Sequence, residues 1–357
     1  MRATVIAAAL ILAIATPAAA QLGGLGKVVD NASKAKKTFD DLNFTDEEER
    51  QIGDNISVML RNKYGVVQDP AVHKYVTLVG TVLAQTSTRP NIKWTFIVLD
   101  TDGVNAFAAP GGFVHITRGA LALIQNEAEL ADVLAHEVAH VTEKDTIRAL
   151  QQAKGQQMAT ANRGEFVKQI SNRGFDMILN GQFSQKDEEN ADKVGINVAN
   201  KVGYSPGGLN AFLNRLSERN KGLTDRSGFF ASHPATKSRV DAMTKQIVAA
   251  KLMAAATMTP RYTQNIKFPP IPVNSISLVA PPASAEEASK SSSGSSGSSL
   301  SNLAASGNQK SSSQTISSAG SRGVNPDRDA KGGPNKGIVI VTVTPSEVDA
   351  FRRAIAG

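Results

Sequence analysis

The strongest pattern of hydrophobic and polar positions lies in residues 126–141, where apolar residues recur at helical spacing. The apolar positions are Leu130, Leu134, Val138 and Val141. Asn126 can cap this helix, because its side chain can accept the backbone N–H of Glu129 three positions later. The pattern predicts a helix with one buried face.

The same spacing predicts several more helices along the chain. They cover residues 45–64, 70–84, 164–179, 184–202, 206–219 and 234–252. Residues 158–182 are open to two interpretations, a mobile flap or an ordinary packed helix. His73 falls within the second of these helices, where we expect it to be exposed.

Strand signals are fewer than helix signals. One strand is predicted at 94–99, and a second at 113–116 follows the turn sequence Pro110-Gly111-Gly112. The expected fold class is therefore α+β and mainly helical, with a small β-sheet. Residues 45–265 are enough for one sizeable domain.

Candidate chemistry lies inside the long helix, where residues 136–140 read His-Glu-Val-Ala-His. Histidines four positions apart lie on one helix face, with Cβ atoms roughly 5–6 Å apart. His136 and His140 can therefore both bind one tetrahedral zinc ion. Glu137 is placed to take a proton from a metal-bound water as it attacks a carbonyl.

A third protein ligand is needed, because catalytic zinc typically keeps only its fourth position for water. The chain has no cysteine, so the ligand must be His, Asp or Glu. Glu188 and Asp192 share one face of the helix at 184–202, where Glu188 could bind the metal and Asp192 could orient a ligand imidazole. Taken alone, the segment is more typical of a solvated acidic face.

Four separated blocks, in order, carry a resemblance to a known family. The blocks are residues 105–119, 136–140, 188–192 and 232–239, the last reading Ser-His-Pro-Ala-Thr-Lys-Ser-Arg. Between about Thr45 and Ala250 the chain resembles the HtpX-like and BepA-like zinc metallopeptidases. This gluzincin family also includes the CaaX prenyl proteases. The combination of blocks is more specific than the zinc motif alone.

The resemblance implies a role for each matching residue. It makes His136, His140 and Glu188 the ligands of one Zn²⁺ per chain and Glu137 the general base. Asp192 becomes the hydrogen-bond partner of a ligand. The catalytic residues would further include His233 and Arg239, which approach the reaction centre and stabilise the oxyanion. In BepA-like members the histidine instead covers the metal.

The strand made of Phe113, Val114, His115 and Ile116 is a candidate for substrate binding. We expect it to form an edge strand along the cleft of a gluzincin-type domain. An edge strand binds extended peptides through backbone hydrogen bonds, which suits a protease that meets unfolded chains. His115 itself is interpreted as a strand histidine without a metal role, since the ligand set is already complete.

The first twenty residues predict a cleavable signal peptide. Arg2 supplies the positive charge, residues 5–15 the apolar run and Ala18-Ala-Ala20 the cleavage site. Residues 21–44 are expected to be a mobile lead-in. No later stretch approaches the roughly 20 apolar residues of a membrane span, so no transmembrane segment is expected in the mature chain. The periplasm is the expected location, and the extracellular space is the alternative.

The C-terminal third changes in composition. Residues 266–336 are rich in Pro, Ser and Gly and predict a disordered linker. Residues 337–357 predict a β-α segment, a strand at 337–343 followed by a helix with a capping box at Thr344 and Glu347. So short a segment cannot fold alone. We expect it to dock on its own domain or on an unknown protein partner.

The net charge of the chain and its distribution bear on the expected partners. The formal charge of +7 is spread without a dense basic run, so nucleic acid is not an expected partner. The sequence predicts a zinc metalloendopeptidase that cleaves unfolded or misfolded envelope proteins. A chaperone or binding protein with latent proteolysis, its metal plugged by His233, is the alternative. A purely structural zinc domain is disfavoured, because such a site needs no base like Glu137.

Overall fold

The computed structural model describes most of the region between residues 44 and 276 and the C-terminal end of the chain. The described residues are 44–152, 163–180, 183–221, 232–233, 237–272, 275–276 and 337–356. The predicted signal peptide (1–20), nearly all of the lead-in (21–44) and most of the linker (266–336) lie outside them.

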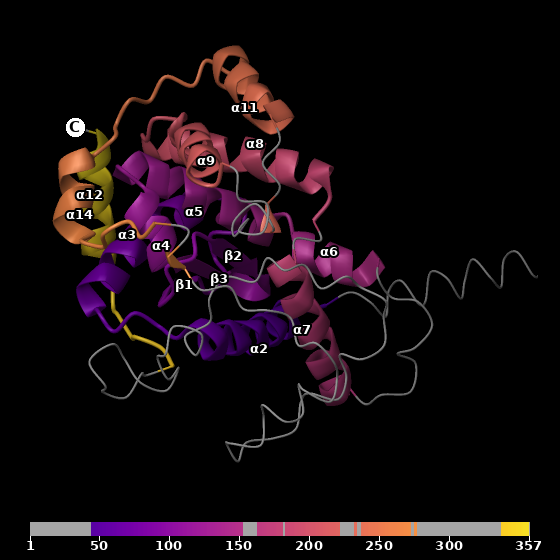
Figure 1. Cartoon of the computed structure of the whole chain (residues 1–357). Helices are drawn as coiled ribbons and strands as arrows, with labels where there is room; N and C mark the ends of the chain where they lie inside the picture. The colour runs from indigo at the N-terminus through magenta and orange to yellow at the C-terminus, as the bar shows by residue number, and fades with distance from the viewer. Residues whose placement is uncertain are drawn as a thin grey trace, which may run out of the picture. The chain divides into compact units, whose positions relative to one another are not determined.

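Helices dominate the described part of the chain (Figure 1). They are α2 (Asp46–Tyr64), α3 (Pro70–Thr86), α4 (Arg118–Leu123), α5 (Glu127–Thr142), α6 (Asp145–Gln152), α7 (Arg163–Asn180), α8 (Gln185–Val202), α9 (Gly208–Arg219), α11 (Lys237–Ala249), α12 (Thr259–Asn265) and α14 (Pro345–Ala356). All six of the further helices expected from apolar spacing are present, and α5 confirms the seventh. The fold is therefore α+β and mainly helical, as predicted.

The described strands form one sheet with the order β1-β3-β2. Its members are β1 (Thr95–Leu99), β2 (Ala106–Ala109) and β3 (Phe113–Thr117). β3 pairs parallel to β1 and antiparallel to β2. The prediction that Phe113 to Ile116 form an edge strand is therefore wrong. Both backbone edges of β3 are occupied by neighbouring strands, so it cannot add a peptide, and β1 and β2 take the two edge positions.

The turn between β2 and β3 is the short 3₁₀ segment η1 (Pro110–Gly112). Gly111 and Gly112 have φ values of 69° and 91°, in the region that favours glycine. Helix α2 presses against this turn through Gly53, where a Cβ would lie only 1.8 Å from the carbonyl oxygen of Pro110. The turn signal in the sequence is thus confirmed, and α2 holds it in place.

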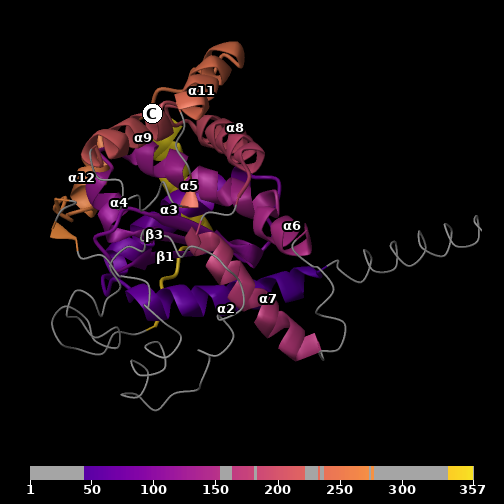
Figure 2. The ribbon, with the colours of Figure 1, turned by 45° about the vertical axis from the view of Figure 1, so that its right-hand side comes forward.

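Helix α5 lies at the centre of the fold, between the sheet on one side and α8 and α9 on the other (Figures 1 and 2). All its residues are buried, so the helix is covered beyond the predicted stripe. Helix α7 packs against α2 and buries Phe166 and Ile170. For residues 163–180 the packed-helix interpretation is therefore the right one. None of the helices in the described ranges combines the length and apolar character of a membrane span.

Three expectations outside the site need correction. His73 is 1% exposed, because its Nε2 lies 2.8 Å from the carbonyl oxygen of Val67 inside the fold. The linker does not begin at 266, since Ile266 and Ile276 are buried against the domain. Residues 338–343 form no strand, because no strand of the described region pairs with them.

The end of the chain contains the helix predicted from its capping box. The hydroxyl of Thr344 accepts the backbone N–H of Glu347, and α14 follows. Val348, Phe351 and Ile355 on this helix are buried. The helix packs against α3 and α8, and its position beside α3 is visible in Figure 1.

Candidate metal centre

The zinc motif lies on α5, as the sequence predicts. Asn126 caps the helix by accepting the backbone N–H of Glu129. His136 and His140 then fall on one face, and their Nε2 atoms lie 3.1 Å apart. Both rings are buried. Two imidazole nitrogens this close, aimed at a common point, suit a shared metal ion rather than a direct contact.

Glu188 reaches the same point from the first turn of α8. A reciprocal capping box between Ser184 and Asp187 starts that helix. The carboxylate oxygens of Glu188 lie 3.5 Å from Nε2 of His136 and 3.5 Å from Nε2 of His140. The structure therefore brings together the three ligands that the sequence named.

The approach of α8 to α5 depends on a glycine. A Cβ on Gly195 would lie 2.8 Å from the backbone nitrogen of His136. No ordinary side chain fits there, so glycine allows the two helices to pack closely at the level of the metal ligands. This small residue was not identified as a site residue from the sequence.

His233 completes a cluster of four donor groups. Its Nδ1 lies 3.2 Å from Nε2 of His136 and 3.1 Å from Oε1 of Glu188. Candidate ligand atoms of His136, His140, Glu188 and His233 all lie within 4.8 Å of one another. This set of three imidazoles and one carboxylate matches the ligands and number that a tetrahedral zinc site uses.

Glu137 lies at the same centre with no assigned partner. Its side chain is fully buried, and neither carboxylate oxygen has a hydrogen-bond partner among the described residues. Nε2 of His233 lies 3.4 Å from Oε1 of Glu137. A buried carboxylate without a partner is costly, so this orphan group fits a general base that acts on water or substrate.

The candidate ligands shift one another's pKa values. Burial alone would lower the pKa of His136, but the carboxylates of Asp192 and Glu188 raise it to about 10. Burial raises the pKa of Glu188, but the charge of His233 and hydrogen bonding with His136 outweigh it. The Glu188 pKa therefore lies well below its usual range. Without a cation the raised pKa of His136 lets its ring carry compensating charge, and a metal ion could replace that charge.

Asp192 and Arg239 stand behind His136. Oδ1 of Asp192 lies 3.0 Å from Nδ1 of His136, as expected for a carboxylate that orients a ligand. Arg239 donates to both oxygens of Asp192 at 2.8 and 2.7 Å, and its Nη1 lies 2.8 Å from Glu188. Each guanidinium nitrogen thus contacts a carboxylate. The arginine thus supports the candidate ligands, and its oxyanion role stays a prediction.

Sequence reasoning missed two residues beside His140. Nδ1 of His140 lies 2.6 Å from Oδ2 of Asp145, at the start of α6. The ring of Phe183 stacks on the same imidazole with centroids 4.7 Å apart. The available signal for Asp145 was its position five residues after the second histidine, where a turn can bring it back to the ring.

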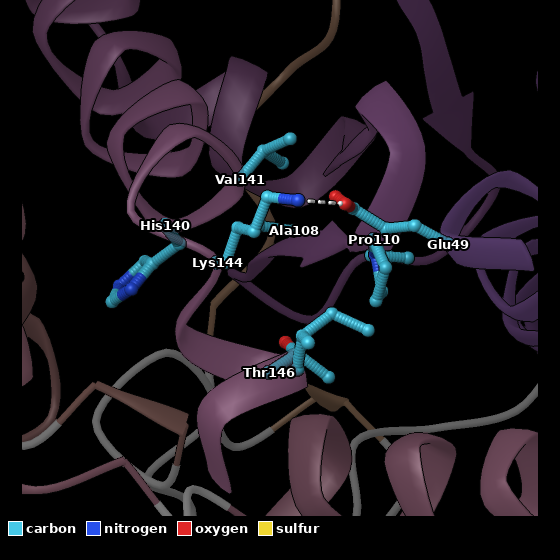
Figure 3. Close-up of a pocket in the computed structure, with 9 residues that line it drawn as sticks. Glu49, Ala108, Pro110, His140, Val141, Lys144 and Thr146 are labelled. Atoms are coloured by element: carbon cyan, nitrogen blue, oxygen red, sulfur yellow. Dashed lines mark ion pairs between the residues drawn. The ribbon is translucent and has the colours of Figure 1, made fainter. Parts of the chain in front are cut away.

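A small pocket lies beside the metal centre, and of the four donor residues only His140 lines it. A pocket of about 10 Å³ lies between the end of α5 and strand β2, lined by Ala108, Pro110, His140 and Lys144 among others (Figure 3). This volume holds about one water molecule. Phe113, Val114, His115 and Ile116 do not line it. His115 instead contacts Ser57, with Nε2 2.8 Å from Oγ, inside the sheet.

The ligand helix and the carboxylate from a following helix are the arrangement of a gluzincin-type metallopeptidase. Comparison with known proteins makes the assignment specific. Residues 70–247 match the model described as peptidase family M48. The chain belongs to this family, and the resemblance drawn from the motifs is confirmed.

Relatives agree with this assignment. The putative beta-barrel assembly-enhancing protease of Vibrio cholerae is 28% identical over 209 residues, 55% of this chain and 43% of the relative. Metalloprotease LoiP of Escherichia coli is 31% identical over 144 residues, 38% of this chain and 56% of LoiP. A mitochondrial metalloendopeptidase of Schizosaccharomyces pombe is 26% identical over 212 residues, which are 57% of this chain and 62% of the relative. The chain thus spans less than half the length of the Vibrio cholerae relative.

Proposed function

We propose that this protein is a zinc-dependent endopeptidase, with His136, His140 and Glu188 as zinc ligands and Glu137 as general base. The convergence of four buried donor groups beside a buried carboxylate that lacks a partner supports it most directly. The donor set is rich in imidazole and has no thiolate, which suits zinc at a catalytic site. A structural zinc domain would not need the orphan Glu137.

The chemistry divides between the metal and the chain. Bound zinc would polarise the scissile carbonyl and lower the pKa of water. Glu137 would take the proton of the attacking water and return it to the leaving amine. Asp192 and Arg239 hold the ligand carboxylate and the His136 ring, so the ligands keep their geometry while protons move.

We further propose that the state described here is latent. Nδ1 of His233 occupies the fourth position of the donor cluster, and its Nε2 lies beside Glu137. The histidine therefore covers the position that water needs and also blocks the base. A chaperone or binding protein with latent proteolysis remains the second candidate for the same reason.

Substrates and location are inferred from sequence and relatives together. The related proteins are named for β-barrel assembly and for metalloprotease activity, and the chain opens with a predicted signal peptide. We propose unfolded or misfolded envelope proteins in the periplasm as substrates. Of the two edge strands in the described sheet, β1 already pairs with Val66 through Leu99, so the outer edge of β2 is the candidate for peptide pairing.

The test is the Glu137→Gln variant of the purified protein, assayed on an unfolded casein with and without chelator. We expect one zinc per chain in both proteins and a loss of cleavage of about 10²–10⁴-fold in the variant. Glu143→Gln, at the end of the same helix, is the matched control and should retain activity. Undiminished cleavage by Glu137→Gln would refute the assignment.

The same assay separates the two roles of His233. If His233 plugs the metal, His233→Ala should cleave unfolded chains faster than the wild type while keeping its zinc. If His233 stabilises the oxyanion, turnover should fall by about 10²–10³-fold instead. We expect the increase, because Nδ1 lies within the ligand cluster.

We also propose that the C-terminal helix docks on its own domain. Phe351 lies under the guanidinium of Arg261 and against the ring of Tyr75, and Lys74 pairs with Glu347 at 2.6 Å. Ile355 contacts Gly203 at the end of α8, about 22 Å along that helix from Glu188. Truncation after residue 336 should therefore lower the melting temperature and leave peptidase kinetics unchanged. A rise in activity would show instead that the tail covers the cleft.

A further inference from the structure

We propose that Asp145 and Arg148 form a positioning pair that fixes the imidazole of His140 and ties it to the helix carrying Glu188. The proposal rests on the metal site proposed above and adds two residues to it. Neither residue lies in the four sequence blocks that carry the family resemblance, residues 105–119, 136–140, 188–192 and 232–239. Both are placed by contacts at the junction between α5 and α6.

The contact with His140 defines the state of the ring. Oδ2 of Asp145 lies 2.6 Å from Nδ1 of His140, and the Asp145 residue is 1% exposed. A carboxylate accepts and cannot donate, so Nδ1 must carry the hydrogen of this bond. The lone pair of the neutral ring is then on Nε2, which faces Glu188 and His136. Asp145 thus selects the tautomer that can bind a metal.

The local backbone explains how Asp145 reaches back. Lys144 follows the end of α5 with a φ of 56°, a left-handed conformation unusual for a residue with a side chain. The turn starts α6 at once, so that its first residue returns to the histidine five positions earlier. The Lys144 side chain points the other way and pairs with Glu49 at 2.9 Å (Figure 3).

Arg148 connects this junction to the second ligand helix. Its Nη2 lies 2.5 Å from Oδ1 of Asp145 and 2.7 Å from Oδ1 of Asp187. Asp187 is the capping-box residue of α8 and directly precedes Glu188. The guanidinium therefore holds the free oxygen of Asp145 and, at the same time, the start of α8. One residue links the supports of two ligands.

The experiment compares zinc affinity of full-length metal-free proteins by competition with a chromogenic chelator. We expect Asp145→Asn to bind zinc about 10–100-fold more weakly than the wild type. Arg148→Met should lose about fivefold, as for one partly exposed ion pair. Asp46→Asn is the matched control, since Asp46 also opens a helix and pairs with an arginine. It should stay within about twofold.

A second readout separates positioning from general stability. Zinc should raise the melting temperature of Asp145→Asn less than it raises that of the wild type or Asp46→Asn, because binding energy is lost. Equal zinc-induced shifts, or an unchanged zinc affinity, would overturn the proposal. If Asp145→Asn does not fold, an unchanged zinc affinity of Arg148→Met would overturn the proposal instead. Failure of the wild type to bind zinc would instead refute the metal site itself.

Discussion

Two histidines of the metal centre are each backed by an aspartate and an arginine, yet the two sets are built differently. The distal set is His136, Asp192 and Arg239, and the local set is His140, Asp145 and Arg148. In the distal set the arginine follows the aspartate by 47 residues and has a side chain only 1% exposed. In the local set the separation is three residues and the arginine side chain is 42% exposed.

The difference indicates that the same combination of histidine, aspartate and arginine can have two roles, one in stabilising the fold and one in orienting a ligand. The local set needs only the turn after α5, so it can form as soon as that turn does, before distant helices pack. The distal set exists only when α8 and α11 have docked, and it leaves charges buried. We therefore expect the distal set to matter for the integrity of the fold and the local set mainly for ligand orientation.

The largest effect is expected from replacing the arginine of each set, Arg239 or Arg148. Arg239→Met leaves Asp192 and Glu188 buried without their counter-charge, so the free energy of unfolding of the metal-free protein should fall by about 3–5 kcal/mol. Arg148→Met should cost about 0–1 kcal/mol, because water screens a half-exposed pair. Urea unfolding measures both. Equal losses would show that the two sets do not differ in this way.

A smaller effect is expected from Gly195→Ala, which acts on the distal set alone. The added methyl would lie 2.8 Å from the backbone of His136, so α8 must shift away from α5. We expect a loss of stability of about 1–3 kcal/mol, as in overpacked cores, and weaker zinc binding. The His140 contact with Asp145 should persist, which the NMR signal of the His140 Nδ1 proton would report. Loss of that signal would contradict the independence of the local set.

The smallest effect concerns His115, a buried histidine that contacts a hydroxyl rather than a carboxylate. Burial and the nearby charge of Arg61 lower its pKa to about 3. Below pH 6.5 the unfolded chain takes up a proton that the folded state refuses, so stability falls as pH falls from 6.5 toward 3.

The expected slope for this one group is about 1.4 kcal/mol per pH unit at most, and about 1 kcal/mol is lost between pH 6.5 and 5.5. His115→Gln should remove this part of the acid sensitivity in the metal-free protein, measured by urea unfolding at each pH. An unchanged slope would mean that His115 is already protonated in the fold. It would then resemble His136, whose pKa is raised.

The helices and the ligand trio followed from the sequence because their signals are local. The cap at Asn126 and the spacing of His136 and His140 each lie within one or two turns. Such patterns are decided by neighbouring residues. The family blocks then joined ligands from separate helices.

The strand order and the supporting residues did not follow, for physical reasons. Whether Phe113 to Ile116 lie at an edge depends on which strands pair with them, and pairing is not a local property. An aspartate in the first turn of a helix is common for its interaction with the helix dipole, so the position of Asp145 five residues after His140 did not single it out. The tail strand failed similarly, because residues 338–343 form a ladder only beside another strand.

The large sequence separation of the metal donors has a further consequence for the stability of the fold. No disulfide is available to a protein without cysteine, yet His136 and His233 meet at one point although they are 97 residues apart. An ion held there would tie two distant parts of the folded chain to one point. For a covalent bridge, a loop of roughly 100 residues is estimated to contribute about 4.7 kcal/mol. A chelator would then act on this fold as a reducing agent acts on a disulfide-bonded one.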